Sequence, residues 1–352
     1  AKEAGVSTAT VSRVLNNPGY KCSSEELRER IWKIARELNY MPNEAARNLK
    51  KGITDTSQKV WYLDVLMTRT GNLETDPFFS ELLRVIESEI HRQGCILMHI
   101  FHQPLFSNDR KCRTENIDKV IAQMEPDGDI RSDGLIIIGK CNDNVLKKLS
   151  AKYKSIVSVN RNSTNYLVDE VICDGKRIAA MAVEYLIGLG HRKIGYVGDC
   201  HNESRYKGYQ DTLFQYGIDI DISFVIEAEH TEAEGYAVME RLIQRGDAPT
   251  AIYCANDMIA IGMLKCLNKY KNRYYVPSII SSDDIEEAQY TRPMLTTVRI
   301  PKEEMGKFAL YLLIDRLGGG HKGIVRTELE GKLMIRESCT LVENANRMEY
   351  YI

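Results

Sequence analysis

The sequence predicts a small all-α helix-turn-helix head followed by an α/β body with two doubly wound parallel-sheet lobes. Three observations support this fold class: a helix-turn-helix pattern at residues 4–16, a polar linker at residues 52–59, and apolar strands alternating with amphipathic helices from residue 60 onward. Such alternation is typical of parallel sheets covered by helices. At 352 residues the chain exceeds one typical domain and can bury a large core.

The helix-turn-helix pattern lies at the start of the chain. Gly5 supplies the turn, because a residue without a Cβ readily adopts left-handed backbone. Ser7 can cap the next helix by accepting a hydrogen bond from a free N–H of its first turn. Val11, Val14 and Leu15 then fall on one apolar face. An ordinary amphipathic surface helix would share this pattern, since short motifs of this kind give false positives.

The opposite face of this helix is small, rich in hydroxyl groups and suited to a DNA groove. Arg13 is its only charge and is placed to read a guanine edge, while the hydroxyl and amide side chains can lie near phosphates. The side chains predicted to face bases are Thr8, Ala9 and Arg13, and those predicted near phosphates are Ser7, Thr10 and Asn16.

Two further helices are predicted in the head. Ser23 or Ser24 caps the first, which ends near Asn39 and carries an apolar stripe that packs on the preceding helices. Asn43 can cap a second helix that reaches Lys50. Because two turns of helix are unstable alone in water, this segment must form against DNA or against its own copy.

Charge is divided unevenly along the chain. The net charge is −2, but residues 1–52 carry ten basic and six acidic side chains, a balance of +4. A basic head on an acidic body indicates nucleic-acid binding by the head. The nine cysteines include no C-x-x-C pair, which favours reduced thiols. With no run of about 20 apolar residues and no signal peptide, we expect a cytoplasmic protein without a membrane span.

The body alternates strands and helices in two similar halves. Strands are assigned to apolar runs bounded by turn residues, and helices to apolar side chains at helical spacing. The predicted strands are 60–67, 95–101, 133–139, 155–159, 193–197, 224–227, 251–254 and 278–281. The predicted helices are 78–93, 116–124, 178–189, 206–216, 231–245 and 257–270. Two lobes with a cleft between them follow.

Two runs in the head resemble a known family. AGVSTATVSRVLN at residues 4–16 and ELNYMPNEAARNLKKG at residues 37–52 are similar to the DNA-binding head and hinge of the LacI/GalR family of bacterial transcription regulators. That family places one helix in the major groove and inserts a hinge leucine into the minor groove. The resemblance implies that Leu49 is this leucine, with Lys50 beside it. The remaining implied DNA contacts are Ser24, Tyr40 and Asn43. Leu27 departs from the family's usual Thr.

The body shows landmarks of the same family in the same order, at residues 76–79, 133–137, 190–194, 255–257 and 293–298. The family's body is similar to periplasmic sugar-binding proteins, whose lobes are joined by three crossings. The resemblance implies a helix-turn-helix domain at 1–41 and a hinge helix with linker at 42–57. It also implies a first lobe at 58–171 and 302–328 and a second lobe at 172–301 and 329–345. The segment 101–131 is longer than usual for the family.

Polar side chains follow three predicted strands of the second lobe. Arg205, Asn256 and Asp283 come after the strands at 193–197, 251–254 and 278–281. Ligands in such sheets bind at the carboxyl ends of strands. A guanidinium, an amide and a carboxylate can each bind two adjacent sugar hydroxyls. Alternatively, Asp283 and Arg205 form a salt bridge and Asn256 caps the following helix.

The family resemblance implies effector contacts at these three positions and at two more, Phe79 and Asn160. His230 falls where relatives often carry an aromatic residue that stacks on the ligand. The predicted effector is a sugar or a glycoside.

Enzyme activity finds little support. There is no G-x-S-x-G motif, and the glycine-rich stretch 318–322 lacks the spacing of a phosphate-binding loop. His99 and His102 have no third ligand in view. We therefore expect no catalytic residue, no metal and no cofactor.

The sequence thus predicts a ligand-responsive transcription regulator, a repressor of carbohydrate genes whose effector in the inter-lobe cleft alters operator affinity. Its expected partners are double-stranded operator DNA, the small-molecule effector and a second copy of the chain, since such heads bind two-fold related half-sites. Residues 344–352 lack leucine heptads, so a dimer is expected. The alternative is a sugar-binding transport receptor, which the head domain opposes.

Overall fold

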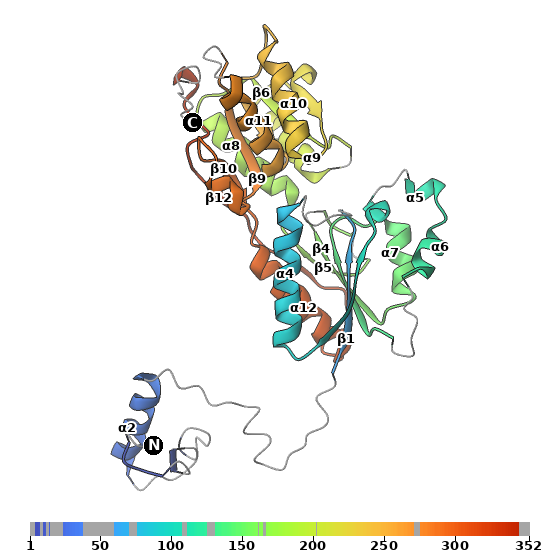
Figure 1. Cartoon of the computed structure of the whole chain (residues 1–352), viewed down its shortest axis with the longest axis vertical. Coiled ribbons are helices and arrows are strands. Elements are labelled where there is room, and N and C mark those ends of the chain that lie inside the picture. Colours follow the sequence, from blue (N-terminus) through green and yellow to red (C-terminus); the bar gives the residue numbers. More distant parts are fainter. Residues whose placement is uncertain are drawn as a thin grey trace. The chain divides into compact units, whose positions relative to one another are not determined.

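The computed structural model describes residues 4–7, 10–11, 14, 24–37, 60–69, 76–107, 111–124, 131–160, 162–164, 167–201, 203–270 and 275–344. The chain divides into two compact units, Ala1–Lys59 and Val60–Ile352, which are called the head and the body below (Figure 1). Among the described residues, no helix combines the length and apolar character needed to cross a bilayer.

The described part of the head confirms the predicted turn and cap. Gly5 has a φ of +66°, in the left-handed region. The Ser7 hydroxyl accepts the backbone N–H of Thr10 at 3.1 Å and lies 2.9 Å from the Thr10 hydroxyl. The next described helix is α2, Glu25–Glu37, and Ser24 caps it by accepting the Leu27 N–H at 3.1 Å.

A small apolar core holds the described part of the head together. Val14 and Ile31 are each 2% exposed and pack with Ala4, and four partly buried side chains surround them. These four are Val6, Val11, Leu27 and Ile34. The family departure at Leu27 therefore contributes apolar packing. The predicted DNA contacts Thr8, Ala9, Arg13, Asn16, Tyr40, Asn43, Leu49 and Lys50 lie outside the described residues.

The Ser7 cap gives a first testable prediction. Ser7→Ala removes the acceptor for a first-turn N–H and should lower helix stability in the head by about 0.5–2 kcal/mol. Hydrogen exchange of the head amides in the full chain measures this effect. Ser150→Ala, at the end of a body helix, is the control and should leave that exchange unchanged. Equal exchange in wild type and Ser7→Ala would contradict the capping role.

The first lobe is built on a parallel sheet with the strand order β11-β5-β4-β3-β1-β2. Its strands are β1 Tyr62–Met67, β2 Ile96–His102, β3 Gly134–Ile138, β4 Ser155–Asn160, β5 Asp169–Ile172 and β11 Arg326–Glu328. Its helices are α4 Pro77–Arg92, η2 Pro104–Ser107, α5 Lys111–Thr114, α6 Ile117–Ala122, α7 Asp143–Ser150 and α12 Lys302–Leu317.

Side-chain alternation along these strands creates two apolar faces. Val65 of β1 packs toward α4 and α12, whereas its neighbour Leu66 packs with α6 and α7 on the opposite face. Figure 1 shows the α4 and α12 pair on one side of this sheet and α7 on the other. The sheet is therefore doubly wound, as predicted.

The second lobe has the strand order β12-β10-β9-β8-β6-β7. Its strands are β6 Ile194–Gly198, β7 Val225–Glu227, β8 Ala251–Cys254, β9 Ser278–Asp283, β10 Thr296–Arg299 and β12 Lys332–Met334. Its helices are α8 Gly175–Gly188, α9 Ser204–Gln215, η3 Ile222–Phe224, α10 Glu232–Ile243, α11 Asp257–Tyr270, η4 Glu286–Gln289 and η5 Val342–Asn344. Strand β12 runs antiparallel to β10, and the other pairs are parallel.

Close helix packing in the second lobe depends on glycine. A Cβ on Gly262 of α11 would lie 2.0 Å from the carbonyl oxygen of Glu232 in α10, so the two backbones touch at this point. The chain passes from one sheet to the other after β5, after β10 and after β11. These three crossings join the lobes on one side and leave the carboxyl ends of the strands facing the cleft.

The predicted strands and helices of the body are all present, with ends that differ by at most three residues. No ranges were predicted for the helices α5, α7 and α12 or for the strands β5, β10, β11 and β12. Strand β12 is also an exception to the expected parallel pairing.

Candidate ligand-binding cleft

A cavity open to solvent lies between the two lobes. About 420 Å³ of space lies among its lining atoms, a figure that includes space open to solvent. The first lobe contributes Arg69, Phe79, Lys140 and Asn160 to its wall, among other residues. The second lobe contributes Glu203 and Arg205. Three of the six side chains predicted to bind an effector, Phe79, Asn160 and Arg205, therefore line one cavity.

Arg205 lies at this cavity with 1% of its surface exposed, and it is the largest fully buried side chain among the described residues. Its Nε donates to Glu203 at 3.0 Å, one terminal nitrogen donates to the carbonyl of Ala255, and the other lies 3.1 Å from His230 Nε2. Burial opposes the charged form, but the Glu203 carboxylate, together with Tyr196 and Asp283, more than offsets burial and raises the pKa of Arg205. The ion pair at this position is with Glu203, which the sequence did not single out.

His230 and Asn256 are not among the described residues that line the cavity, but His230 contacts two that are. The His230 ring touches Arg205 of its own lobe and Arg69 of the first lobe, whose terminal nitrogen contacts both ring nitrogens. The Asn256 amide donates to the His230 carbonyl at 3.3 Å. Its oxygen accepts the Ile259 N–H at 3.1 Å, so Asn256 caps α11, which the sequence offered as an alternative role.

Asp283 ends β9 and is 3% exposed. Its backbone has a φ of 135°, a conformation that costs a residue with a Cβ and tends to occur at functional sites. Its carboxylate lies close enough to act electrostatically on Arg205 and on Asp257. Burial and then this neighbouring charge raise the pKa of Asp257 to about 7.

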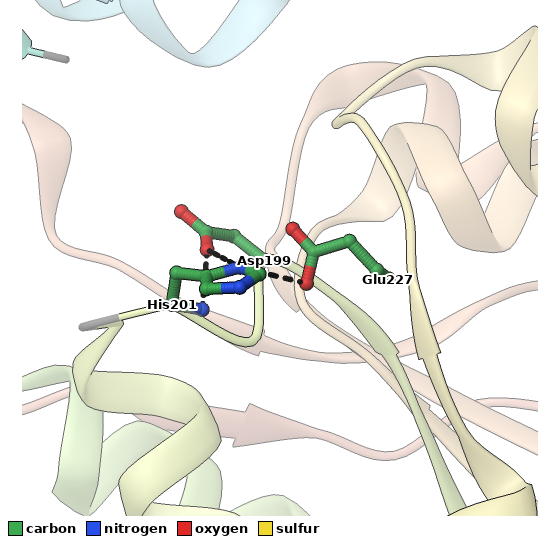
Figure 2. Close-up of side chains that lie close together, drawn as sticks. All are labelled: Asp199, His201 and Glu227. Atoms are coloured by element: carbon green, nitrogen blue, oxygen red, sulfur yellow. Dashed lines mark hydrogen bonds and ion pairs between the residues drawn. The ribbon is translucent and has the colours of Figure 1, made fainter. Parts of the chain in front are cut away.

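A second polar cluster lies at the ends of β6 and β7. Figure 2 shows His201 directed toward the carboxylates of Asp199 and Glu227, with His201 Nδ1 at 4.0 Å and 3.4 Å from their nearest oxygens. Ligand atoms of all three lie within 4.8 Å of one another, a spacing compatible with a metal ion. However, those oxygens accept the backbone N–H groups of His201 and Cys200 at 2.7 Å. The turn explains their position, and we assign no metal to them.

Comparisons with known proteins agree with this architecture. Residues 1–43 match the family of bacterial regulatory proteins of the lacI type, and residues 183–339 match a periplasmic binding protein-like domain. The HTH-type transcriptional repressor MelR of Bacillus subtilis (strain 168) is 30% identical over 353 residues, which cover 96% of each chain.

Two solved structures share the fold of the chain. A complex of the transcriptional regulator CelR with cellobiose has a TM-score of 0.66 at 24% identity and covers 96% of this chain and 98% of that one. The lac repressor dimer bound to operator and the anti-inducer ONPF has a TM-score of 0.65 at 23% identity, with 97% of each chain covered.

Proposed function

The chain belongs to the lacI family of bacterial regulatory proteins, and we propose on this premise that it is a ligand-responsive repressor of carbohydrate genes. The observation that carries the proposal is the combination of a lacI-type head with a cavity between two lobes that has Arg205 buried in its wall. The transport-receptor alternative gives no role to the head. We also infer that the protein works in the cytoplasm, as a regulator and not as an enzyme.

The head is the proposed DNA-binding part. Its turn at Gly5 and its cap at Ser7 support a helix positioned to enter a major groove. We assign base and backbone contacts to the residues predicted above, from Ser7 to Lys50. Leu49 is assigned to the minor groove, where an inserted apolar side chain opens a base step and bends the DNA.

The cleft is the proposed effector site. Phe79 and Asn160 of the first lobe and Arg205 of the second face the same cavity, so an effector would contact both lobes. His230, Asn256 and Asp283 are assigned to holding Arg205 and the strand ends in place behind it. The cellobiose complex of CelR supports a carbohydrate as the ligand class.

We propose that the active form is a homodimer, as in the lac repressor structure bound to operator. Two heads then bind two half-sites related by symmetry. An effector that closes the lobes would change the spacing of the two hinge segments. This change couples the cleft to DNA binding through two distinct sites.

Operator affinity with and without a bound carbohydrate tests the proposal. Double-stranded DNA selected from a random pool by the full chain supplies the operator, and light scattering gives the oligomeric state. We expect a dimer that prefers a near-palindromic site and whose affinity changes when a carbohydrate is added. Absence of any preferred sequence would contradict the proposed function.

A prediction for base reading follows from the placement of Arg13. Arg13→Ala should weaken binding to the selected operator by about 1–3 kcal/mol and relax the preference at one position of each half-site. Competition binding at fixed salt against single-base variants measures both quantities. Arg84→Ala, exposed on α4, is the control. An Arg13→Ala variant with wild-type preference at every position would exclude this helix from base reading.

A further inference from the structure

Cationic side chains dominate the wall of the cleft. Among the described residues, those that line it and carry charge are Arg69, Lys140 and Arg205, with Glu203 as the acid. Glu203 is already engaged, because it accepts both the Nε and the backbone N–H of Arg205. Asp283 also acts on Arg205 from the second lobe. Both carboxylates therefore interact with Arg205. Within the described part of the chain, no carboxylate lies in ion-pair distance of Arg69.

The contacts of His230 show a surplus of hydrogen-bond donors at this point. Arg69 of the first lobe contacts Nδ1 of His230, and Arg205 of the second lobe lies 3.1 Å from Nε2. A guanidinium group only donates, whereas a neutral imidazole has one accepting nitrogen and a protonated imidazole has none. At most one of the two arginines can therefore donate to the ring.

Arg69 and Arg205, from opposite lobes, converge on one imidazole, which can accept a hydrogen bond from at most one of them. The charge of Arg205 is compensated by Glu203, whereas Arg69 is half-buried and pairs with no carboxylate of the described residues. Oxyanions of phosphate and carboxylate groups match the planar fork of arginine and accept two parallel hydrogen bonds from it.

We propose, on the basis of the function proposed above, that the effector is a carbohydrate that carries an anionic group, a phosphate or a carboxylate. The anionic group accepts hydrogen bonds from Arg69 in place of His230 and from Arg205, and so connects the two lobes. Arg69 is the residue that distinguishes an anionic from a neutral effector. Lys140 lies in the same wall.

The rest of the cavity fits a sugar ring. Phe79, Val159 and Met305 offer apolar surface for the C–H faces of the ring, and the amides of Asn160 and Asn162 can pair with its hydroxyls. A site of this kind binds the sugar by its uncharged part and selects the charged derivative by its arginines.

Matched ligand sets test the proposal with the full chain. The first set is glucose, glucose 6-phosphate and glucuronate, and the second is cellobiose, cellobiose 6′-phosphate and cellobionate, with inorganic phosphate added alone. Dissociation constants are measured by calorimetry for wild type, for Arg69→Gln and for the control Arg84→Gln, whose side chain is exposed on α4. Thermal unfolding without ligand shows that each variant is folded.

We expect an anionic member of one set to bind at least about tenfold more tightly than its neutral counterpart, because hydrogen bonds to charged groups are the stronger ones. Arg69→Gln should weaken binding of the anionic ligand by about 10- to 100-fold, and Arg84→Gln should leave that binding unchanged. The phosphate and carboxylate members show which oxyanion is preferred.

The inference would be overturned if no anionic ligand bound more tightly than its neutral counterpart. It would also be overturned if Arg69→Gln kept the wild-type preference for the anionic ligand, or if inorganic phosphate bound as tightly as every sugar. A neutral sugar that binds tightly and changes operator affinity would leave the proposed function intact. Failure of the chain to select any DNA sequence would contradict the proposed function instead, so the two failures are distinguishable.

Discussion

Arg205→Met is expected to destabilise the body by about 3–5 kcal/mol and to abolish effector binding. The size of the loss follows from burial: Glu203 is 4% exposed, and without Arg205 it would remain as an uncompensated buried charge. The carbonyl of Ala255 would also lose its donor. Urea unfolding of the full chain, followed by tyrosine and tryptophan fluorescence, measures the stability change.

A second variant separates the stability effect from the binding effect. Arg205→Met combined with Glu203→Gln removes both charges of the pair, so it should recover most of the lost stability, because a buried pair adds little over neutral packing. It should not recover effector binding, since the guanidinium is still missing. If the double variant responds to the effector like wild type, Arg205 has only a structural role.

Asp257→Asn is expected to remove a pH dependence of stability worth about 3 kcal/mol between pH 5 and pH 8. Asp257 is fully buried at the start of α11 and accepts the hydroxyls of Ser281 and Thr297, each at 2.6 Å, and the N–H of Ile285 at 2.9 Å. Burial and the nearby Asp283 carboxylate raise its pKa from an ordinary 3.8 to about 7. Each unit of such a difference corresponds to about 1.4 kcal/mol.

The sign of this effect follows from proton binding. Between about pH 4 and pH 7 the folded state keeps the proton of Asp257, while the unfolded state releases it. The stability that the protonated carboxyl contributes is therefore complete below about pH 4 and is lost as the pH rises through about 7. An asparagine amide in place of this carboxyl cannot ionise, and its oxygen and NH2 group can still pair with the Ile285 N–H and the two hydroxyls.

Urea unfolding of wild type and Asp257→Asn at pH 5 and pH 8 tests this prediction. Other titrating groups, such as His321 with its raised pKa, are common to both proteins and cancel in the difference. We expect wild type to lose about 3 kcal/mol more than the variant over this interval. Parallel losses in the two proteins would show that Asp257 is ionised in the folded state throughout.

The sequence was sufficient where a signal is local. Strand β8 and helix α11 begin and end at the predicted residues, because an apolar run and a helical stripe with turn residues between them specify both. The turn at Gly5 and the cap at Ser7 likewise depend on neighbouring residues. Arg205 was identified because it follows a strand end, the position at which doubly wound sheets bind ligands.

The sequence was insufficient where residues far along the chain determine whether a side chain is buried and whether its charge is compensated. Strand β5 begins with two acids, Asp169 and Glu170, so its sequence does not predict a buried strand. Both side chains are nevertheless almost fully buried. Asp169 is neutralised by Arg316 and His321, which lie about 150 positions later in the chain. Only the packing of α12 against this edge of the sheet brings those charges together.

In the cleft, too, some features follow from local sequence and others only from tertiary contacts. Polar residues that follow strands predicted the chemistry of the second lobe. Arg69, however, follows β1 with no pattern that marks it, and its contact His230 is 161 positions away. No local pattern links them. The arrangement of the two lobes brings Arg69, His230 and Arg205 together and so sets the charge of the cavity. Electrostatic interaction depends on distance in space and not on separation along the chain.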